Sequence, residues 1–278
     1  MRKKSLSRTI AAILIVTLVL VGVPESRADG PETTGTLTAQ SVTIAHSVAV
    51  PGQNQYATET ELNYWLYLPE ADDRDADELW PLVLFLHGRG ERGDDLEVLK
   101  QYGPPMMIED GADFPFILAA PLCSADFYWP EVPDLLMGLI EHLQTNHAID
   151  PDRIIFTGLS MGGAGTWALA STYPEVPAAI VPIASFYPDP QSGMIGAVPE
   201  NICHLAEVPA WVLHGDADDA MPLYNGQVIV EALEACGGDV RFTILVGADH
   251  AASWERAYAD PELFAWMMEQ RREVPPED

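Results

Sequence analysis

Five residues near the middle of the chain have the types and spacing of a serine nucleophile. Residues 158–162 read Gly-Leu-Ser-Met-Gly, between a β-branched and aromatic run at 153–157 and a run of small residues at 163–170. A Gly-x-Ser-x-Gly sequence at a strand-to-helix turn holds its serine in a sharp, strained conformation, and its glycines leave room for neighbouring backbone. We therefore predict that Ser160 is a nucleophile. Because the pentapeptide also occurs by chance, its context must support the prediction.

A second segment offers donors for the oxyanion that forms during acyl transfer. The apolar run 81–86 predicts a strand buried on both faces, and it leads directly into the Gly-rich turn 87–93. A backbone N–H of such a turn and the N–H of the residue after the nucleophile can form an oxyanion hole. These donors would be Arg89 and Met161, each worth about 3–4 kcal/mol toward the tetrahedral oxyanion. Alternatively, the turn is Gly-rich only for tight geometry.

The acid that orients the general base is expected in the loop after the strand-like run 209–214. Three aspartates lie there, Asp216, Asp218 and Asp219. We predict Asp218, because it stands four residues before Pro222, where the loop turns into the next helix, and Asp219 is the alternative. In a very acidic chain any one of them could instead be a solvated loop residue.

His250 is the candidate general base. It follows the strand-like run 240–246, and we expect it in the loop after the last strand. Its imidazole would take the serine proton and return it to the leaving group, while the acid fixes the tautomer. We expect Asp249 to be a bystander, and His87 and His214 to be buried turn residues bonded to the backbone. The nucleophile, acid and base occur in that order along the chain.

Segments across most of the chain match one family of enzymes. They are 65–69, 84–88, 90–95, 103–105, 149–153, 158–163, 211–215 and 257–263, together with His250, Trp254 and Trp266. The chain thereby resembles the secreted bacterial carboxylesterases of the α/β-hydrolase superfamily, often labelled predicted peptidases, and their dienelactone-hydrolase-like and polyhydroxybutyrate-depolymerase-like relatives. The resemblance implies a serine esterase with Ser160, Asp218 and His250 as its triad. Arg89 departs from it, because relatives usually carry a small residue there, so its side chain is expected at the acyl or alcohol pocket.

The first 28 residues have the pattern of a secretory signal peptide. Basic residues precede an apolar run at 10–23, and Ser26 and Ala28 are small residues at the two positions that a signal peptidase reads. About fourteen apolar residues are short for a membrane span of roughly twenty. We predict cleavage after Ala28 and a secreted or periplasmic protein, with an uncleaved membrane anchor as the alternative.

Charge and cysteine content restrict the partners of the protein. With 42 acidic and 14 basic residues, the formal net charge is −28. We therefore expect no nucleic-acid partner and no stable membrane association after cleavage of the signal. Three cysteines, Cys123, Cys203 and Cys236, allow at most one internal disulfide, and the sequence does not choose the pair. No Cys-x-x-Cys or His-x-x-x-His spacing occurs, so we predict neither a metal site nor a cofactor.

Alternating strand-like and helix-like runs predict a mostly parallel central sheet with helices on both faces, the α/β-hydrolase fold. Strands are expected at 38–50, 61–68, 81–86, 116–120, 153–157, 178–184, 209–214 and 240–246, and helices at 132–147, 163–170, 223–235 and 261–271. The predicted organisation is a signal peptide at 1–28, a flexible segment at 29–37 and one domain at 38–278. The segment 185–208, rich in Pro and Gly, leaves room for little or no lid.

An open site favours short acyl groups or esters attached to a polysaccharide. Trp129 and Tyr187, with Tyr128 and Phe186, are the aromatic candidates for the substrate pocket, although each could instead be core packing. One alternative function is a serine peptidase with the same triad, although the sequence shows nothing that resembles the gating domain of such relatives. Another is a non-catalytic secreted binding protein.

Overall fold

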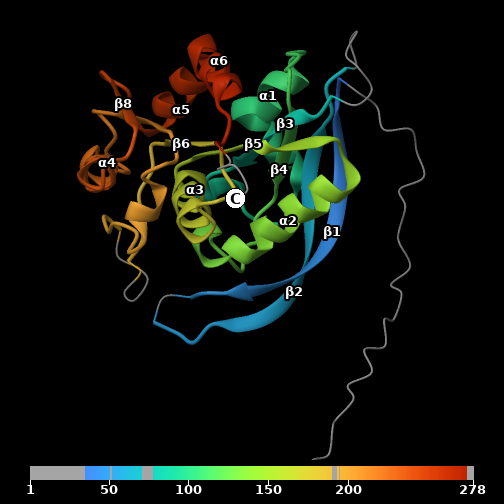
Figure 1. The fold of residues 1–278 in the computed structure, drawn as a ribbon, viewed down its shortest axis with the longest axis horizontal. Helices are drawn as coiled ribbons and strands as arrows, with labels where there is room; N and C mark the ends of the chain where they lie inside the picture. The colour runs from blue at the N-terminus through green and yellow to red at the C-terminus, as the bar shows by residue number, and fades with distance from the viewer. Residues whose placement is uncertain (1–34, 51, 71–77, 190–192, 194, 274–278) are drawn as a thin grey trace, which may run out of the picture. The chain divides into compact units, whose positions relative to one another are not determined.

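Eight strands form one sheet in the order β1-β2-β4-β3-β5-β6-β7-β8 in a computed structural model of the chain (Figure 1). Their bounds are β1 Leu37–Val48, β2 Tyr56–Tyr67, β3 Trp80–Leu86, β4 Ile117–Pro121, β5 Ile149–Leu159, β6 Ala179–Ile183, β7 Ala210–Gly215 and β8 Val240–Leu245. The pairs β1–β2 and β2–β4 are antiparallel, and every other neighbouring pair is parallel. The predicted mostly parallel α/β-hydrolase sheet is thereby confirmed.

The structure describes residues 35–50, 52–70, 78–189, 193 and 195–273. The predicted signal peptide at 1–28 lies outside them, as does most of the segment at 29–37. Among the described residues, no helix has the length and apolar character needed to cross a bilayer.

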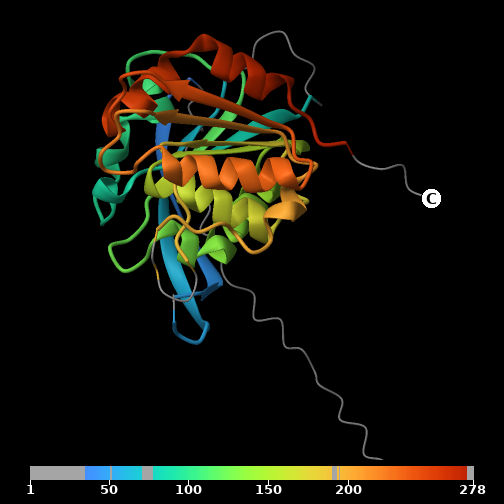
Figure 2. The same cartoon turned by 90° about the vertical axis from the view of Figure 1, so that its left-hand side faces the viewer.

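Helices cover both faces of the sheet (Figure 2). They are α1 Gly103–Glu109, α2 Pro133–Asn146, α3 Met161–Thr172, α4 Tyr224–Ala235, α5 His250–Ala259 and α6 Pro261–Glu269, with short 3₁₀ segments η1 Arg89–Glu91, η2 Leu96–Gln101, η3 Trp129–Glu131 and η4 Ile202–Leu205. Strand β3 shows how its side chains divide between the two layers. Leu82 and Leu84 pack with α2, α3 and α4, whereas Val83 and Phe85 pack with α1, α5 and α6.

The antiparallel edge of the sheet extends further than the sequence pattern predicted. The strand expected at 61–68 begins at Tyr56 and pairs along its whole length with β1. Residues 56–61 are mostly exposed, so they lack the apolar alternation that marks a half-buried strand. The two strands form the long curved ribbon at one side of the molecule in Figure 1.

One disulfide fixes the region between β6 and α4. Cys203 in η4 is bonded to Cys236, the residue that caps α4, across a sequence separation of 33 residues. Cys123 is a free, buried thiol. The structure therefore selects the pair that the sequence left open.

Candidate active site

Ser160 occupies a sharp turn between β5 and α3. Its backbone has φ 53° and ψ −115°, a left-handed conformation that costs a residue with a side chain about 1–3 kcal/mol. Its N–H donates to the Ile183 carbonyl (2.9 Å), which ties the turn to β6. A Cβ on Gly162 would lie 1.8 Å from the Leu86 carbonyl oxygen, and one on Gly158 would lie 2.5 Å from Gly162 backbone. Both glycines are therefore required by close backbone approach.

Ser160, His250 and Asp218 form a continuous hydrogen-bonded relay. His250 Nε2 lies 2.9 Å from Ser160 Oγ, and His250 Nδ1 lies 2.6 Å from Asp218 Oδ2. Ser160 follows β5, Asp218 follows β7 and His250 follows β8. The carboxyl ends of these strands share one edge of the parallel sheet. These distances are within the range required for proton transfer between a nucleophile and a general base.

Asp218 is held by its own loop. Its side chain is buried, and its Oδ1 accepts hydrogen bonds from the backbone N–H groups of Ala220 (3.0 Å) and Met221 (2.7 Å). The other carboxylate oxygen is thereby left for His250. Asp219, the alternative acid, is exposed, and Asp216 is exposed and accepts the Gly247 N–H. Of the three aspartates in this loop, the structure brings Asp218 to His250 and leaves Asp216 and Asp219 exposed.

His250 is the first residue of helix α5, which corrects the expectation that it lies in a loop. The Asp249 carboxylate caps this helix by accepting the Ala252 N–H (2.9 Å), so Asp249 has a structural part in the turn that presents the histidine. The Trp254 ring packs edge-on against the imidazole, with ring centroids 4.9 Å apart. An aspartate before a short run of helix-forming residues was the signal for this cap, and the sequence interpretation missed it.

Two further histidines brace the site through the backbone, as predicted. His214 is buried beside the acid, and its Nε2 donates to the Met221 carbonyl (2.7 Å). His87 is buried at the end of β3, where Nδ1 donates to the Gly88 carbonyl (2.6 Å) and Nε2 accepts the Cys123 N–H (2.9 Å). Burial lowers the pKa of His87 to about 4, so this neutral tautomer persists at ordinary pH.

The two candidate oxyanion donors begin helical segments next to the serine. Arg89 is the first residue of η1 and Met161 the first of α3. The first N–H groups of a helix have no acceptor within that helix, so they can point at an anion. Both residues line the same cavity as Ser160.

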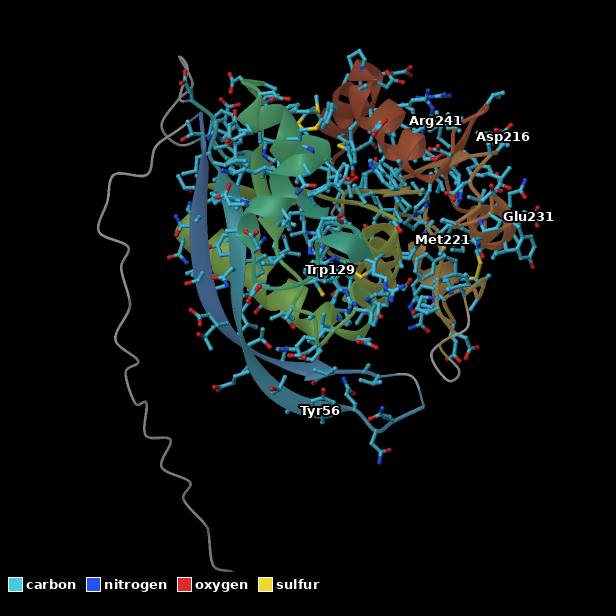
Figure 3. The ribbon with its side chains drawn as sticks, turned by 180° about the vertical axis from the view of Figure 1, so that it is seen from behind. Tyr56, Trp129, Asp216, Met221, Glu231 and Arg241 are labelled. Atoms are coloured by element: carbon cyan, nitrogen blue, oxygen red, sulfur yellow. A yellow bond between two sulfur atoms is a disulfide. The ribbon has the colours of Figure 1, made fainter. Side chains whose placement is uncertain are left out.

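That cavity has a volume of about 610 Å³ and is mainly apolar and aromatic. Besides the serine and the two donors, its lining includes Ala49, Tyr128, Pro130, Glu131, Phe186, Tyr187, Pro188, Ile195 and Met221. Tyr187 lies on the cavity wall, and its contact with a substrate stays a prediction. Trp129 does not line the cavity, because it is fully buried and its Nε1 donates to the His87 carbonyl (3.1 Å), which corrects the expectation for this residue. In Figure 3, Trp129 lies in the middle of the molecule, well inside its margins.

Within the described residues, no three His, Cys, Asp or Glu side chains are grouped so that they could hold a metal ion. The site geometry rests on the serine, the imidazole, the carboxylate and backbone N–H groups.

The strand order and the serine turn are those of the α/β-hydrolase fold. Residues 131–260 match the family described as Phospholipase/Carboxylesterase. A crystal structure of a thermostable esterase superposes with a TM-score of 0.65 at 29% identity, covering 83% of this chain and 63% of that one.

Two curated proteins are also similar in sequence. Poly(3-hydroxyalkanoate) depolymerase C of Paucimonas lemoignei is 39% identical over 67 residues, 21% of this chain and 16% of that protein. The uncharacterized peptidase YuxL of Bacillus subtilis (strain 168) is 24% identical over 245 residues, 75% of this chain and 36% of that protein. The chain therefore spans less than two thirds of the length of each of these relatives. The matched proteins are thus named as esterases, a depolymerase and a peptidase, and the chain shares the α/β-hydrolase fold.

Proposed function

We propose that this protein is a serine hydrolase that cleaves carboxylic esters through an acyl-enzyme on Ser160. The observation that carries the proposal is the relay from Ser160 Oγ through His250 to the buried Asp218 carboxylate, with distances of 2.9 and 2.6 Å. A left-handed serine between two obligatory glycines is a strained arrangement that a pure scaffold would not need.

Acylation follows from the positions of these groups. Ser160 Oγ attacks the ester carbonyl carbon while His250 Nε2 takes the hydroxyl proton. The imidazolium that forms donates from Nδ1 to Asp218, whose Oδ1 is occupied by backbone donors and whose Oδ2 is therefore fixed toward the ring. The N–H groups of Arg89 and Met161 would stabilise the tetrahedral oxyanion. His250 then returns the proton to the leaving alcohol, and the ester C–O bond breaks.

Deacylation repeats these steps with water. His250 Nε2 takes a proton from the water that attacks the acyl carbonyl, and it returns this proton to Ser160 Oγ as the carboxylic acid leaves. Every group in the cycle belongs to the chain itself, so the proposal requires no cofactor.

The cavity supports a preference for short acyl groups or for esters carried on a polysaccharide. It opens to solvent beside exposed Tyr128 and Ile195, and its volume of about 610 Å³ suits a small ester. A poly(3-hydroxyalkanoate) depolymerase and a thermostable esterase among the similar proteins agree with ester substrates. We further propose export to the periplasm or beyond, supported by the signal-like residues 1–28, with cleavage after Ala28.

Hydrolysis of 4-nitrophenyl acetate, butyrate and octanoate by the chain without residues 1–28 tests the proposal. We expect turnover that declines with acyl length and disappears in Ser160→Ala, whereas Ser41→Ala, an exposed serine on β1, retains it. Equal turnover in wild type and Ser160→Ala would overturn the assignment of the nucleophile. Cleavage of peptide 4-nitroanilides without ester hydrolysis would support the alternative that the protein is a serine peptidase. The similarity to the uncharacterized peptidase YuxL is the reason to test it.

A further inference from the structure

Arg89 is an exposed cation on the wall of the catalytic cavity. Arg89 lines the same cavity as Ser160 and Tyr128, and it is exposed. If its own backbone N–H serves the oxyanion, the guanidinium lies one arginine side chain away from the scissile carbonyl. A carboxylate at that separation on the substrate could bind it with two parallel N–H···O bonds.

Arg89 also differs from the other basic side chains of the described residues. Arg92, Lys100, Arg153, Arg241, Arg256, Arg271 and Arg272 each contact a carboxylate or a backbone carbonyl. Arg89 has no such partner among the described residues, although the chain carries 42 acidic residues and only 14 basic ones. A surface with three carboxylates for each cation easily supplies a partner, so the arrangement around Arg89 leaves its charge available to a ligand.

The other charged residue on the cavity wall does not compete strongly for this cation. The Glu131 carboxylate accepts the Tyr128 N–H (2.8 Å), and burial raises the pKa of this carboxyl group while the charge of Arg92 opposes that rise. Arg92 in turn lies over the Tyr128 ring, 4.0 Å from its centroid. Glu131 and Arg92 thus both contact Tyr128, and Arg89 makes neither of these contacts.

We propose that the Arg89 guanidinium binds a carboxylate carried by the ester substrate, so that the preferred substrates are anionic esters such as half-esters of dicarboxylic acids or esters of hydroxy-acids. This inference rests on the proposed function and adds the substrate class. The carboxylate can belong to the acyl part or to the alcohol part of the ester, and two pairs of probes separate these sources.

The first pair is mono-4-nitrophenyl adipate against 4-nitrophenyl hexanoate, which differ by a carboxylate at the end of an acyl chain of the same length. The second is 4-acetoxybenzoate against methyl 4-acetoxybenzoate, in which the carboxylate lies on the leaving group. The measured quantity is the ratio of kcat/KM for the anionic and the neutral member of each pair. A ratio is insensitive to a general loss of activity, which matters because the Arg89 backbone belongs to the proposed oxyanion hole.

We expect Arg89→Gln to lower this ratio about tenfold in one pair, mainly through KM, because an exposed charge-assisted contact is weaker than a buried one. Arg89→Lys should retain part of the preference, and the wild-type ratio should fall as salt is added. Arg241→Gln is the matched control, because it makes the same charge change at an exposed ion pair with Glu262. Arg241 is not among the residues that line the cavity.

The pair that responds identifies the side of the ester that carries the carboxylate. Ratios that stay the same in wild type and Arg89→Gln for both pairs would overturn the inference, as would an equal change in Arg241→Gln. Failure of the proposed function looks different, because Ser160→Ala would then retain turnover of the neutral esters.

Discussion

Replacing Asp218 with asparagine changes one polar group in the relay and leaves its size unchanged. Oδ1 of Asp218 accepts the N–H groups of Ala220 and Met221, and an amide nitrogen cannot accept a hydrogen bond. The asparagine oxygen must therefore stay at the Oδ1 position, which turns its NH₂ group toward His250 Nδ1. That nitrogen then has to accept, so the ring proton moves to Nε2, where it faces Ser160 and prevents removal of the serine proton.

The structure also sets the size of this effect. The productive tautomer returns only if the amide flips, which leaves the part-buried backbone N–H groups of Ala220 and Met221 without their acceptor. Each such loss costs about 1–3 kcal/mol, or about 2–6 kcal/mol together. We therefore expect kcat for Asp218→Asn to fall by between about 30-fold and 10⁴-fold, the upper end matching the loss seen when a serine triad holds the wrong tautomer.

The assay is steady-state hydrolysis of 4-nitrophenyl butyrate, with thermal unfolding as a check that the variant is folded. Asp219→Asn is the matched control, because Asp219 is the exposed neighbouring aspartate, and it should retain wild-type kcat. A folded Asp218→Asn variant with wild-type kcat would refute the reasoning, and a selective loss in Asp219→Asn would assign the acid to that residue.

Three further predictions concern stability. Gly162→Ala should fail to fold to active protein, because the added Cβ would lie 1.8 Å from a carbonyl oxygen, whereas Gly90→Ala, with open space around the new Cβ, should fold normally. The free energy of unfolding should fall by about 3 kcal/mol between pH 6.5 and pH 4 through His87, whose pKa of about 4 in the folded state lies below the ordinary 6.5, so the unfolded chain binds the proton first as the pH falls. Reducing the disulfide between Cys203 and Cys236, which closes a separation of 33 residues, should cost about 3–4 kcal/mol.

Each stability prediction has its own control. Soluble yield and circular dichroism of the two alanine variants test the glycine, and equal behaviour of the two would contradict the close contact. Urea unfolding of His87→Asn at both pH values should show a smaller dependence on pH than wild type, and an unchanged dependence would exclude this histidine as the cause. The double variant Cys203→Ser with Cys236→Ser should lose its response to dithiothreitol, and an unchanged response would point to another effect of the reductant.

The positions of Ser160, Asp218 and His250 could be predicted because each follows a strand-like run rich in β-branched, aromatic or apolar residues. Parallel strands bring their carboxyl ends to one edge of the sheet, so residues that follow such runs meet there even when they are far apart in sequence. The buried, backbone-bonded state of His87 and His214 followed from the same reasoning. These conclusions depend on local sequence and on one general property of parallel sheets.

What the sequence could not predict depends on contacts between distant residues. Trp129 is drawn into the core because Gly165 of α3 leaves space for it, with an added Cβ there only 2.4 Å from the Trp129 Cβ. Its neighbour Tyr128 remains exposed at the cavity. The choice of Cys203 and Cys236 likewise depends on how η4 packs beside α4. Hydrophobic periodicity, the signal that identified the strands, indicates neither the burial of Trp129 nor the pairing of Cys203 with Cys236.

The central claim is that Ser160 carries the acyl group during turnover. Wild-type protein is mixed with 4-nitrophenyl butyrate, quenched in acid within the first turnovers and examined by intact and peptide mass spectrometry. We expect one butyryl group per chain, located on the peptide that contains Ser160, and none in Ser160→Ala. A butyryl group on another residue, or an equal amount in Ser160→Ala, would contradict it.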